Sequence, residues 1–361
     1  MSAVVSAPLL KVEHLSKQFV AERTVLGRPV KTVRAVDDVD FALIPGETLA
    51  LVGESGCGKS TLARLLMRLI EPSAGTVTLD GEDITALDER ALPAIRRKIQ
   101  LIFQDPFASL NPRMTVGQMI AEPLMLHDIV PAREREGRVL ELLEAVGLGR
   151  QHMNRFPHEF SGGQRQRIVI ARALAARPSV IVCDEPVSAL DVSIRSQILN
   201  LLADLQKEFG LSYLFISHDL SVVRHIADRV AVMYLGRIVE IGSTSEVFSD
   251  PRHPYTRALI SAIPVPAPGA RRERRPVEGD LPSPLNPPSG CHFHTRCPYV
   301  QPICRTDRPA LIAGRTGQPS ACHFRDTLPP ADDILPRAIP IDPRLQRLFA
   351  AFRPENKGVT T

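Results

Sequence analysis

The chain has 361 residues, and its 44 Lys and Arg against 40 Asp and Glu leave a formal net charge of +4. With 44% hydrophobic and 23% charged residues and no apolar run of roughly 18 residues, a wholly disordered chain, a collagen and a bundle of membrane helices are excluded. The small positive excess does not by itself indicate nucleic acid, and six Cys are too few for a disulfide framework, so we expect a reducing cytosol.

Strand and helix patterns alternate along the first 263 residues, which predicts an α/β fold. The predicted strands are Leu49–Val52, Thr76–Leu79, Ile99–Phe103, Val180–Cys183, Tyr213–Ile216 and Val230–Tyr234. Several of them are apolar on both faces, which is typical of a covered parallel sheet. Helical stripes are formed by Leu62, Leu65, Leu66, Leu69 and Ile70, and by Ile194–Phe209. Few strand signals occur between residues 106 and 150, and we expect a helical insertion over about 106–176.

Proline divides the rest of the chain. Only 12 of the 32 Pro lie in residues 1–250, whereas 20 lie in the last 111. We therefore expect one domain over 1–263, a stiff Pro-rich and Arg-rich linker or extended wrapping arm over 264–290, a small Cys-bearing module over 291–325 and a Pro-rich tail over 326–361. The linker carries an arginine cluster at 271, 272, 274 and 275, and the tail holds one short helical pattern at Leu345–Phe352.

A phosphate-binding loop is predicted by the pattern G-x-x-x-x-G-K-S over residues 53–60. An apolar strand precedes it and an amphipathic helix follows, so backbone N–H groups and the helix N-terminus would surround phosphate oxygens. We expect Lys59 to reach the β- and γ-phosphates, Ser60 to ligate Mg²⁺ and Thr61 to contact the α-phosphate. The plainer alternative is a Gly-rich turn with a solvated lysine. The predicted ATP-binding residues are Gly53, Glu54, Ser55, Gly56, Cys57, Gly58, Lys59, Ser60 and Thr61.

Polar residues suited to nucleotide hydrolysis follow three of the other predicted strands. Gln104 follows one strand, Asp184 and Glu185 the next, and His218 a third. Because ligands bind beyond the carboxyl ends of such strands, we expect these residues to converge. Asp184 and Gln104 would hold Mg²⁺, Glu185 would activate the attacking water, and His218 would contact the γ-phosphate. Taken singly, each residue could instead mark a strand end, a turn or a structural histidine.

A second anion site is suggested by Ser161, Gly162, Gly163 and Gln164, which follow Phe160 and precede a helical run. The spacing of Ser161 and Gln164 is that of a helix capping box, which is the structural alternative. That alternative does not explain the two glycines, because glycine in the first turn of a helix costs up to about 1 kcal/mol each.

These motifs, together with Ser188-Ala189-Leu190-Asp191, resemble the ATP-binding cassette (ABC) family from about residue 10 to 250. The resemblance implies a P-loop NTPase parallel sheet, an antiparallel β subdomain and a head-to-tail dimer. ATP would then lie between the phosphate loop of one subunit and the Ser161–Gln164 segment of the other, with Asp191 at the seam. Phe19 is the candidate for stacking on adenine, against an alternative of core packing.

The stretch from Gln104 to Arg113 and the segments 250–256 and 290–324 resemble the oligopeptide/dipeptide/nickel importer ATPases. That subfamily implies a peripheral ATPase on the cytoplasmic face of the membrane. It would bind a second ATPase, two permease subunits docked near residues 105–125 and an extracytoplasmic solute-binding protein, and no nucleic acid. The alternatives are a soluble ABC ATPase acting on nucleic acid or ribosomes, a regulatory cassette of a heterodimer, and an exporter. The first ten residues carry no basic start of a secretory signal.

Four cysteines lie in the small module, namely Cys291, Cys297, Cys304 and Cys322. Their spacing is not that of a C-x₂-C zinc ribbon. The resemblance implies a [4Fe–4S] cluster, and zinc or free thiols remain alternatives. His292, His294 and His323 are expected at the surface unless zinc is bound, and Cys57 and Cys183 are expected to be packing residues.

Overall fold

The computed structural model describes residues 7–23, 29–263 and 279–331. The arginine cluster at 271–275 and the helical pattern at Leu345–Phe352 lie outside the described residues, as do most of the expected linker and tail. Within the described part, no helix is long and apolar enough to cross a membrane.

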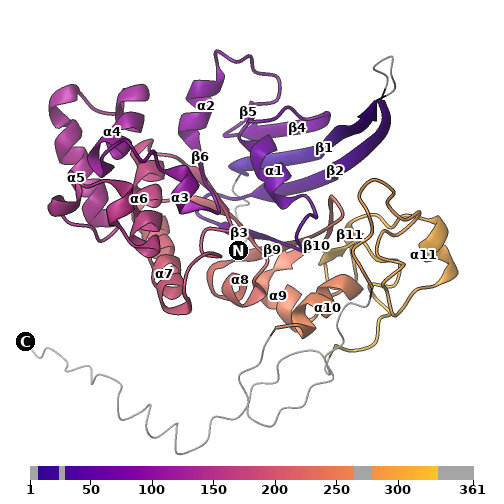
Figure 1. Cartoon of the computed structure of the whole chain (residues 1–361). Coiled ribbons are helices and arrows are strands. Elements are labelled where there is room, and N and C mark those ends of the chain that lie inside the picture. The colour runs from indigo at the N-terminus through magenta and orange to yellow at the C-terminus, as the bar shows by residue number, and fades with distance from the viewer. Residues whose placement is uncertain (1–6, 24–28, 264–278, 332–361) are drawn as a thin grey trace, which may run out of the picture.

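An eight-stranded mixed sheet forms the centre of the molecule (Figure 1), in the order β11-β12-β10-β9-β3-β8-β7-β6. The strands from β9 to β6 run parallel, whereas β10, β12 and β11 add antiparallel pairs at one edge. The bounds are β3 Thr48–Val52, β6 Ile99–Ile102, β7 Val180–Asp184, β8 Ser212–Ser217, β9 Arg229–Tyr234, β10 Arg237–Ser243, β11 Ile312–Ala313 and β12 Pro319–Ser320. The expected parallel sheet is therefore confirmed, but Thr76–Leu79 is not part of it, because that segment pairs antiparallel with residues 10–16 in a second sheet.

A second, antiparallel sheet has the order β2-β1-β4-β5. Its strands are β1 Leu10–Arg23, β2 Pro29–Leu43, β4 Ala74–Leu79 and β5 Glu82–Asp83. One hydrophobic core joins this sheet, the first helix α1 (Lys59–Leu66) and one face of the central sheet. The antiparallel subdomain that the family resemblance implied is present.

The expected stripe from Leu62 to Ile70 was too long. Helix α1 ends at Leu66, and Arg68 has a left-handed backbone with φ of 49°. Leu69 consequently lies outside the helix with 47% of its surface exposed, while Leu62, Leu65 and Leu66 are buried. The left-handed residue turns the chain away, a feature that apolar spacing does not encode.

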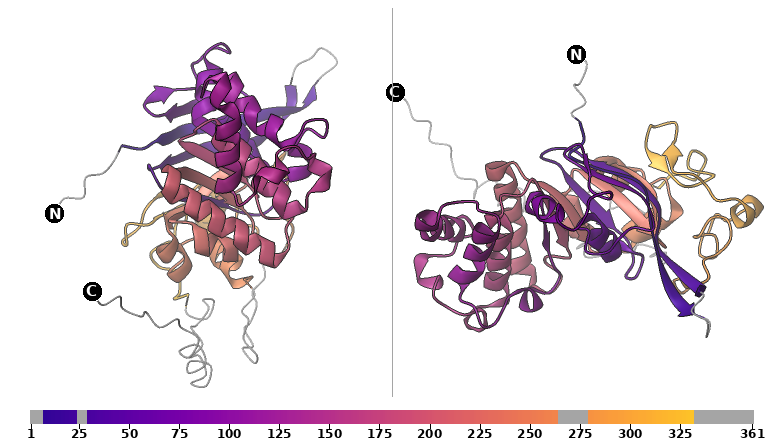
Figure 2. Two further views of the ribbon diagram at one scale, coloured as in Figure 1. Left: turned by 90° about the vertical axis from the view of Figure 1, so that its left-hand side faces the viewer. Right: turned by 90° about the horizontal axis from the view of Figure 1, so that it is seen from above.

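The insertion after β6 is helical, as expected. A separate core joins its helices to the other face of the sheet. Figures 1 and 2 place it at the opposite end of the molecule from the C-terminal module. The helices of the insertion are α3 Pro106–Ser109, α4 Val116–Leu126, α5 Arg135–Ala145 and α6 Gly162–Ala175, with 3₁₀ turns Ala132–Glu134, Arg150–His152 and Pro157–Glu159. Helix α7, Val192–Phe209, follows β7.

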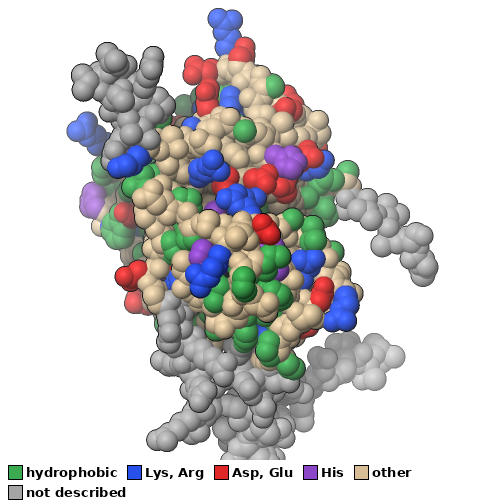
Figure 3. Space-filling model, turned by 90° about the vertical axis from the view of Figure 1, so that its right-hand side faces the viewer, with side chains coloured by type: hydrophobic (Ala, Val, Ile, Leu, Met, Phe, Trp, Pro, Cys, Tyr) green, Lys and Arg blue, Asp and Glu red, His purple; other side chains and the backbone are tan. Residues whose placement is uncertain are grey.

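The remaining helices are α2 Leu92–Lys98, α8 Leu220–Ile226, α9 Thr244–Ser249, α10 Pro254–Ser261 and α11 Pro302–Thr306. The cysteine module packs directly on the first domain, because β12 pairs with β10 through Ser320 and Glu240. A third core combines residues of β9, β10, α10 and the module, including Tyr234, Tyr255 and Phe293. On the face that carries the module, basic, acidic and hydrophobic side chains are interspersed (Figure 3).

Candidate functional site

The phosphate loop joins β3 to α1 and lines a cavity of about 530 Å³. Lys59 is only 5% exposed, and its ammonium donates to the carbonyl oxygens of Gly53 at 2.8 Å and Glu54 at 2.9 Å. Gly58 caps the helix with φ of 111°, and a Cβ there would lie 2.1 Å from the carbonyl oxygen of Ala35. The glycine is therefore required for the close approach of two backbone segments.

Ser60 lines the cavity, and Asp184 lies next to it without lining the cavity itself. The Ser60 hydroxyl donates to Asp184 Oδ1 at 3.1 Å. Burial raises the pKa of the Asp184 carboxyl, and the hydrogen bond from Ser60 opposes that rise. A hydroxyl and a carboxylate are hard oxygen donors of the kind that Mg²⁺ prefers, so these two residues fit the metal.

Glu185 lies between the two other strand-end residues. Its Oε2 accepts a hydrogen bond from Gln104 Nε2 at 3.0 Å, and its Oε1 lies 3.0 Å from His218 Nδ1. Gln104, Glu185 and His218 all line the same cavity as Lys59 and Ser60. They meet because β6, β7 and β8 are adjacent and parallel in the sheet, so their carboxyl ends lie at one edge.

Two family models match the chain: "ABC transporter" over residues 36–188, and "Oligopeptide/dipeptide transporter, C-terminal region" over residues 239–304. The chain is 55% identical over 320 residues to a protein of Sinorhizobium fredii named "Probable peptide ABC transporter ATP-binding protein y4tS", covering 89% of this chain and 91% of that one. It is also 51% identical over 321 residues to the "Dipeptide transport ATP-binding protein DppF" of Haemophilus influenzae, covering 89% and 98%.

This chain belongs to the ABC transporter ATPase family. Among solved structures, a dimeric post-hydrolysis state of the ATP-binding cassette MJ0796 bound to ADP and Pi matches with a TM-score of 0.58 and 31% identity, over 65% of this chain and 98% of that one. A structure of cbiO1 from Clostridium perfringens matches with a TM-score of 0.58 and 30% identity, over 67% and 91%. The protein is thus an ABC ATPase that binds ATP and Mg²⁺.

The cassette's Ser161–Gln164 segment does not line the cavity that holds Lys59. It begins α6, and the capping box is complete: Ser161 N–H donates to Gln164 Oε1 at 3.1 Å, and Gln164 N–H donates to Ser161 Oγ at 3.3 Å. Gly163 also has a packing role, since a Cβ would lie 2.5 Å from Ile194 Cγ2. Asp191 is the N-cap residue of α7, but its side chain makes no capping hydrogen bond to the first turn of the helix.

Phe19 is 42% exposed, so the core-packing alternative is wrong. It pairs with Val33 across β1 and β2, and Val33 lines the cavity whereas Phe19 does not. The wall beside the phosphate loop is built instead from residues that the sequence did not single out: Val33, Arg34, Ala35, Leu235, Gly236 and Pro284. No local motif marks them, because they come from β2, the β9–β10 turn and the C-terminal segment.

The four module cysteines line one small cavity, together with His294, His323 and Phe324. Burial raises the pKa of the Cys297 thiol to about 11 and that of Cys322 to about 12, so a metal would have to displace their protons. Backbone N–H groups of Tyr299 and Phe324 point at Cys297 Sγ and Cys322 Sγ, each at 3.4 Å. Cys57 and Cys183 are buried, as expected.

His292 corrects the expectation of a surface histidine. It is 9% exposed, and its Nε2 lies 3.0 Å from Arg308 Nη2. Burial lowers the pKa of the His292 ring to about 4, which keeps the ring neutral. His294 and His323 contact backbone carbonyl oxygens of Cys291 and Asp307.

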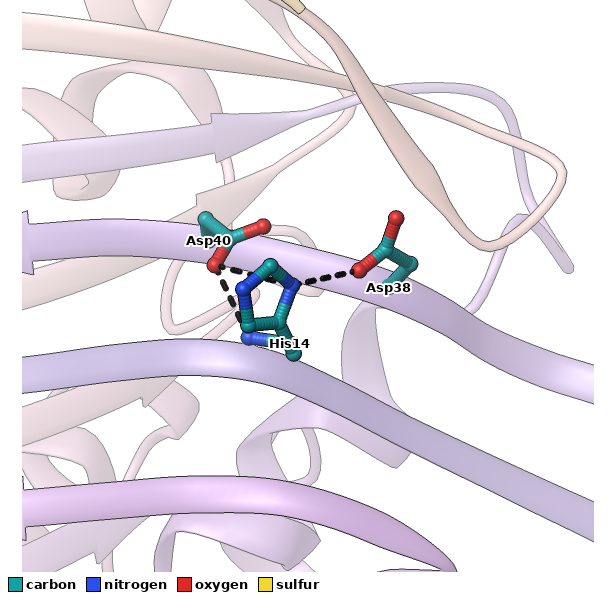
Figure 4. A group of neighbouring side chains, drawn as sticks. All are labelled: His14, Asp38 and Asp40. Carbon is teal, nitrogen blue, oxygen red and sulfur yellow. Dashed lines mark hydrogen bonds and ion pairs between the residues drawn. The ribbon is translucent and has the colours of Figure 1, made fainter. Parts of the chain in front are cut away.

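His14, Asp38 and Asp40 are the one group of three metal-type ligands that the described residues bring within 4.8 Å (Figure 4). His14 is 80% exposed, and its hydrogen bond to Asp38, at 2.9 Å, raises the pKa of the ring. Asp38 already accepts a hydrogen bond from Arg237 Nη2 at 2.8 Å. This group is an exposed ion-pair network rather than a metal centre.

Proposed function

We propose that this ABC ATPase is the energy-supplying subunit of a membrane importer, coupling ATP binding and hydrolysis at a cassette dimer interface to uptake of dipeptides, oligopeptides or a related small solute. The observation that carries the proposal is the Glu185 carboxylate, held between Gln104 and His218 in the cavity that contains Lys59. The peptide-transport names of the relatives and the matched C-terminal region support the choice of solute.

In the proposed mechanism, Lys59 and the loop N–H groups bind the phosphates. Glu185 accepts a proton from a water molecule, whose oxygen forms a bond to the γ-phosphorus while the bond to the ADP oxygen breaks. Gln104 and His218 each hold one oxygen of Glu185, which fixes the orientation of the base. Mg²⁺ held by Ser60, Gln104 and Asp184 would supply charge neutralisation for the phosphate oxygens.

The proposed partners are a second ATPase subunit and the membrane permeases, and each is argued from a surface of this chain. Because Ser161–Gln164 does not line the chain's own cavity, we infer that it serves the nucleotide of a second ATPase subunit. Large apolar side chains near the predicted permease-docking segment 105–125 are exposed, with Phe107 at 59%, Met125 at 51% and Leu126 at 74%. They suit docking to two permease subunits, with the ATPase peripheral on the cytoplasmic face and a solute-binding protein outside.

We also propose that Cys291, Cys297, Cys304 and Cys322 hold a [4Fe–4S] cluster. A single tetrahedral zinc, with Zn–S bonds of about 2.3 Å, needs sulfurs within about 3.8 Å of one another. Among the described residues, no three cysteine sulfurs lie within 4.8 Å. Four thiols around one cavity supply the four sulfur ligands that such a cluster takes, and the two N–H groups directed at sulfur are of the kind that stabilise one.

The transport proposal is tested with the complete complex in liposomes. We expect the chain to copurify with the permeases and its ATP hydrolysis to be stimulated by peptide-loaded binding protein, with Lys59→Ala inactive. Association with ribosomes or nucleic acid in place of permeases would sink the proposal.

The cluster is tested separately by iron and acid-labile sulfide analysis of anaerobically purified protein. Stoichiometric iron and sulfide, absent from Cys297→Ser, is the expected result. Zinc, or no metal, would contradict it.

A further inference from the structure

Arg296 of the C-terminal module contacts the phosphate loop directly. Its Nη1 lies 2.9 Å from Glu54 Oε2 and its Nη2 lies 3.0 Å from Glu54 Oε1, a two-pronged ion pair. The Arg296 side chain is 7% exposed and that of Glu54 is 25% exposed. Glu54 is the second residue of the loop, and the two partners are 242 residues apart in the sequence. A partly buried, two-pronged guanidinium–carboxylate pair holds both groups in one orientation.

Glu54 is also the residue through which the loop holds its lysine. The Glu54 carbonyl oxygen accepts a hydrogen bond from Lys59 Nζ at 2.9 Å, and the Glu54 N–H donates to the Tyr255 hydroxyl at 2.8 Å. The side chain and the main chain of Glu54 are therefore both held by residues C-terminal to the parallel sheet. Any shift of Glu54 moves the atoms that orient Lys59.

The position of Arg296 is itself determined by packing. Its guanidinium lies 6.0 Å from the ring centroid of Tyr234. Phe293, three residues earlier, packs edge-on against Tyr234 with a centroid distance of 5.3 Å and is 2% exposed. The module thus presents the arginine from a rigid aromatic cluster.

We propose that Arg296 is a positioning residue for ATP binding, through which the C-terminal module keeps the phosphate loop in the shape that receives the phosphates. The inference rests on the proposed role of the loop in binding ATP. A Gly-rich loop loses conformational freedom when it closes on a ligand, and an external restraint lowers that entropy cost. The segment before the module supports the same conclusion, because Pro284 lines the nucleotide cavity.

If Arg296 were only one of several residues that attach the module to the first domain, its replacement would affect ATP affinity no more than replacement of another such residue. Arg308 provides the matched control, since it fastens the module to Asp37 at 3.3 Å and does not contact the loop. In the full-length protein, we expect Arg296→Gln and Glu54→Gln each to raise the Kd for a fluorescent ATP analogue, and the KM for ATP, roughly tenfold. The kcat should change by less than about twofold, and Arg308→Gln should leave Kd and KM unchanged.

The double variant distinguishes a pair that acts as a unit from two independent defects. Arg296→Gln with Glu54→Gln should bind no more weakly than either single variant, because the shared interaction is lost only once. Arg296→Lys keeps the positive charge but cannot contact both carboxylate oxygens as the guanidinium does, so its Kd should lie between those of the natural protein and Arg296→Gln. Circular dichroism and thermal unfolding check that each protein is folded, and Glu54→Gln carries the test if Arg296→Gln is not.

Unchanged affinity in folded Glu54→Gln and Arg296→Gln would overturn the inference, as would an equal loss in Arg308→Gln. Lys59→Ala separates this failure from failure of the proposed function. If Lys59→Ala loses analogue binding while the Arg296 and Glu54 variants bind normally, only the positioning role is wrong. If Lys59→Ala binds normally, the loop is not the ATP site.

Discussion

Glu185 has a left-handed backbone, with φ of 50°, which is unfavourable for a residue with a side chain. Three hydrogen bonds hold it there: its N–H donates to the Ile216 carbonyl at 3.0 Å, and its carbonyl accepts from Ser188 N–H at 3.2 Å and Ser188 Oγ at 3.0 Å. Backbone conformations of this kind cost about 1–3 kcal/mol and persist where the surroundings impose them. The fold therefore orients Glu185 toward the cavity before any nucleotide binds.

Replacing Glu185 by Gln should lower ATP turnover by roughly 100-fold or more while ATP-analogue binding is retained, because the amide cannot accept the proton of the attacking water. Turnover and analogue affinity are measured on the same preparation of the full complex. Glu208→Gln, an exposed change on α7, is the control and should hydrolyse normally. Normal hydrolysis by Glu185→Gln would remove Glu185 from the role of base.

Sequence reasoning reached the residues whose signals are local. Asp184 ends a strand of the sheet, and Gln104, Glu185 and His218 follow directly or closely after strands, so the parallel order brings them together. The pairing of Arg296 with Glu54 has no such signal, since it depends on how a segment 242 residues away folds back. Pro284 lies in a stretch predicted as a linker or an extended arm, and no local pattern indicated that it would line the nucleotide cavity.

At the scale of elements, α6 packs against α7 at Gly163, the second of the two glycines that follow Ser161. A Cβ on Gly163 would lie 2.5 Å from Ile194 Cγ2, whereas one on Gly162 would lie 3.6 Å from Leu190 Cδ2, an ordinary contact. Gly163→Ala should therefore push α6 from α7 and destabilise the protein by about 1–3 kcal/mol. Gly162→Ala should be neutral or slightly stabilising, because alanine favours helix more than glycine does.

Thermal unfolding of both variants checks this pair, with each serving as the other's control. Equal melting temperatures would show that the second glycine is not required for packing. Sequence spacing predicted the anion site and the capping box, and only the structure adds this steric reason, because it depends on where Ile194 of a different helix lies.

Helix α3, which begins two residues after Gln104, contacts α6 through two arginine side chains. The Arg165 guanidinium lies 4.0 Å from the ring centroid of Phe107, and Arg165 Nε donates to the Phe160 carbonyl at 3.0 Å, directly before Ser161. Arg172 of the same helix donates to the Ser109 carbonyl at 2.7 Å. A displacement of the proposed permease-docking segment would therefore move the start of α6.

Phe107→Ala should lower peptide-stimulated ATP hydrolysis of the complete complex by roughly threefold or more, since the cation–π contact to Arg165 is lost. The affinity for an ATP analogue should not change, because Phe107 does not line the cavity. Phe209→Ala, at the exposed end of α7, is the matched control. Full stimulation with Phe107→Ala would show that this contact does not transmit the signal.

At the scale of the whole molecule, the C-terminal module extends the central sheet rather than standing apart. Glu240 of β10 is buried at that junction, where it accepts hydrogen bonds from the N–H of Arg252 at 2.6 Å, the N–H of His253 at 2.9 Å and Gln318 Nε2 at 2.6 Å. Proline content marked this part of the sequence as separate. The pairing of β12 with β10 spans about 80 residues, so no local pattern could predict it.

Burial raises the pKa of Glu240 from 4.5 to about 7, so the stability of the protein depends on pH through this carboxyl. The folded protein binds the Glu240 proton more tightly than the unfolded chain, so this carboxyl lowers the free energy of unfolding as pH rises from 4.5 to 7. A shift of that size corresponds to about 3 kcal/mol. His253 acts in the opposite direction, since burial lowers its pKa to about 3, and the positive charge of Arg257 faces the same carboxylate.

Glu240→Gln removes the Glu240 contribution and leaves His253 and Arg257 in place. The melting temperature of the natural protein minus that of Glu240→Gln should therefore fall by roughly 5 °C between pH 4.5 and 7.5. Glu82→Gln, exposed on β5, should give a flat difference over the same range. A flat difference for Glu240→Gln would mean that Glu240 ionises as readily in the folded protein as in the unfolded chain. In that case, the junction of module and sheet would be open to water.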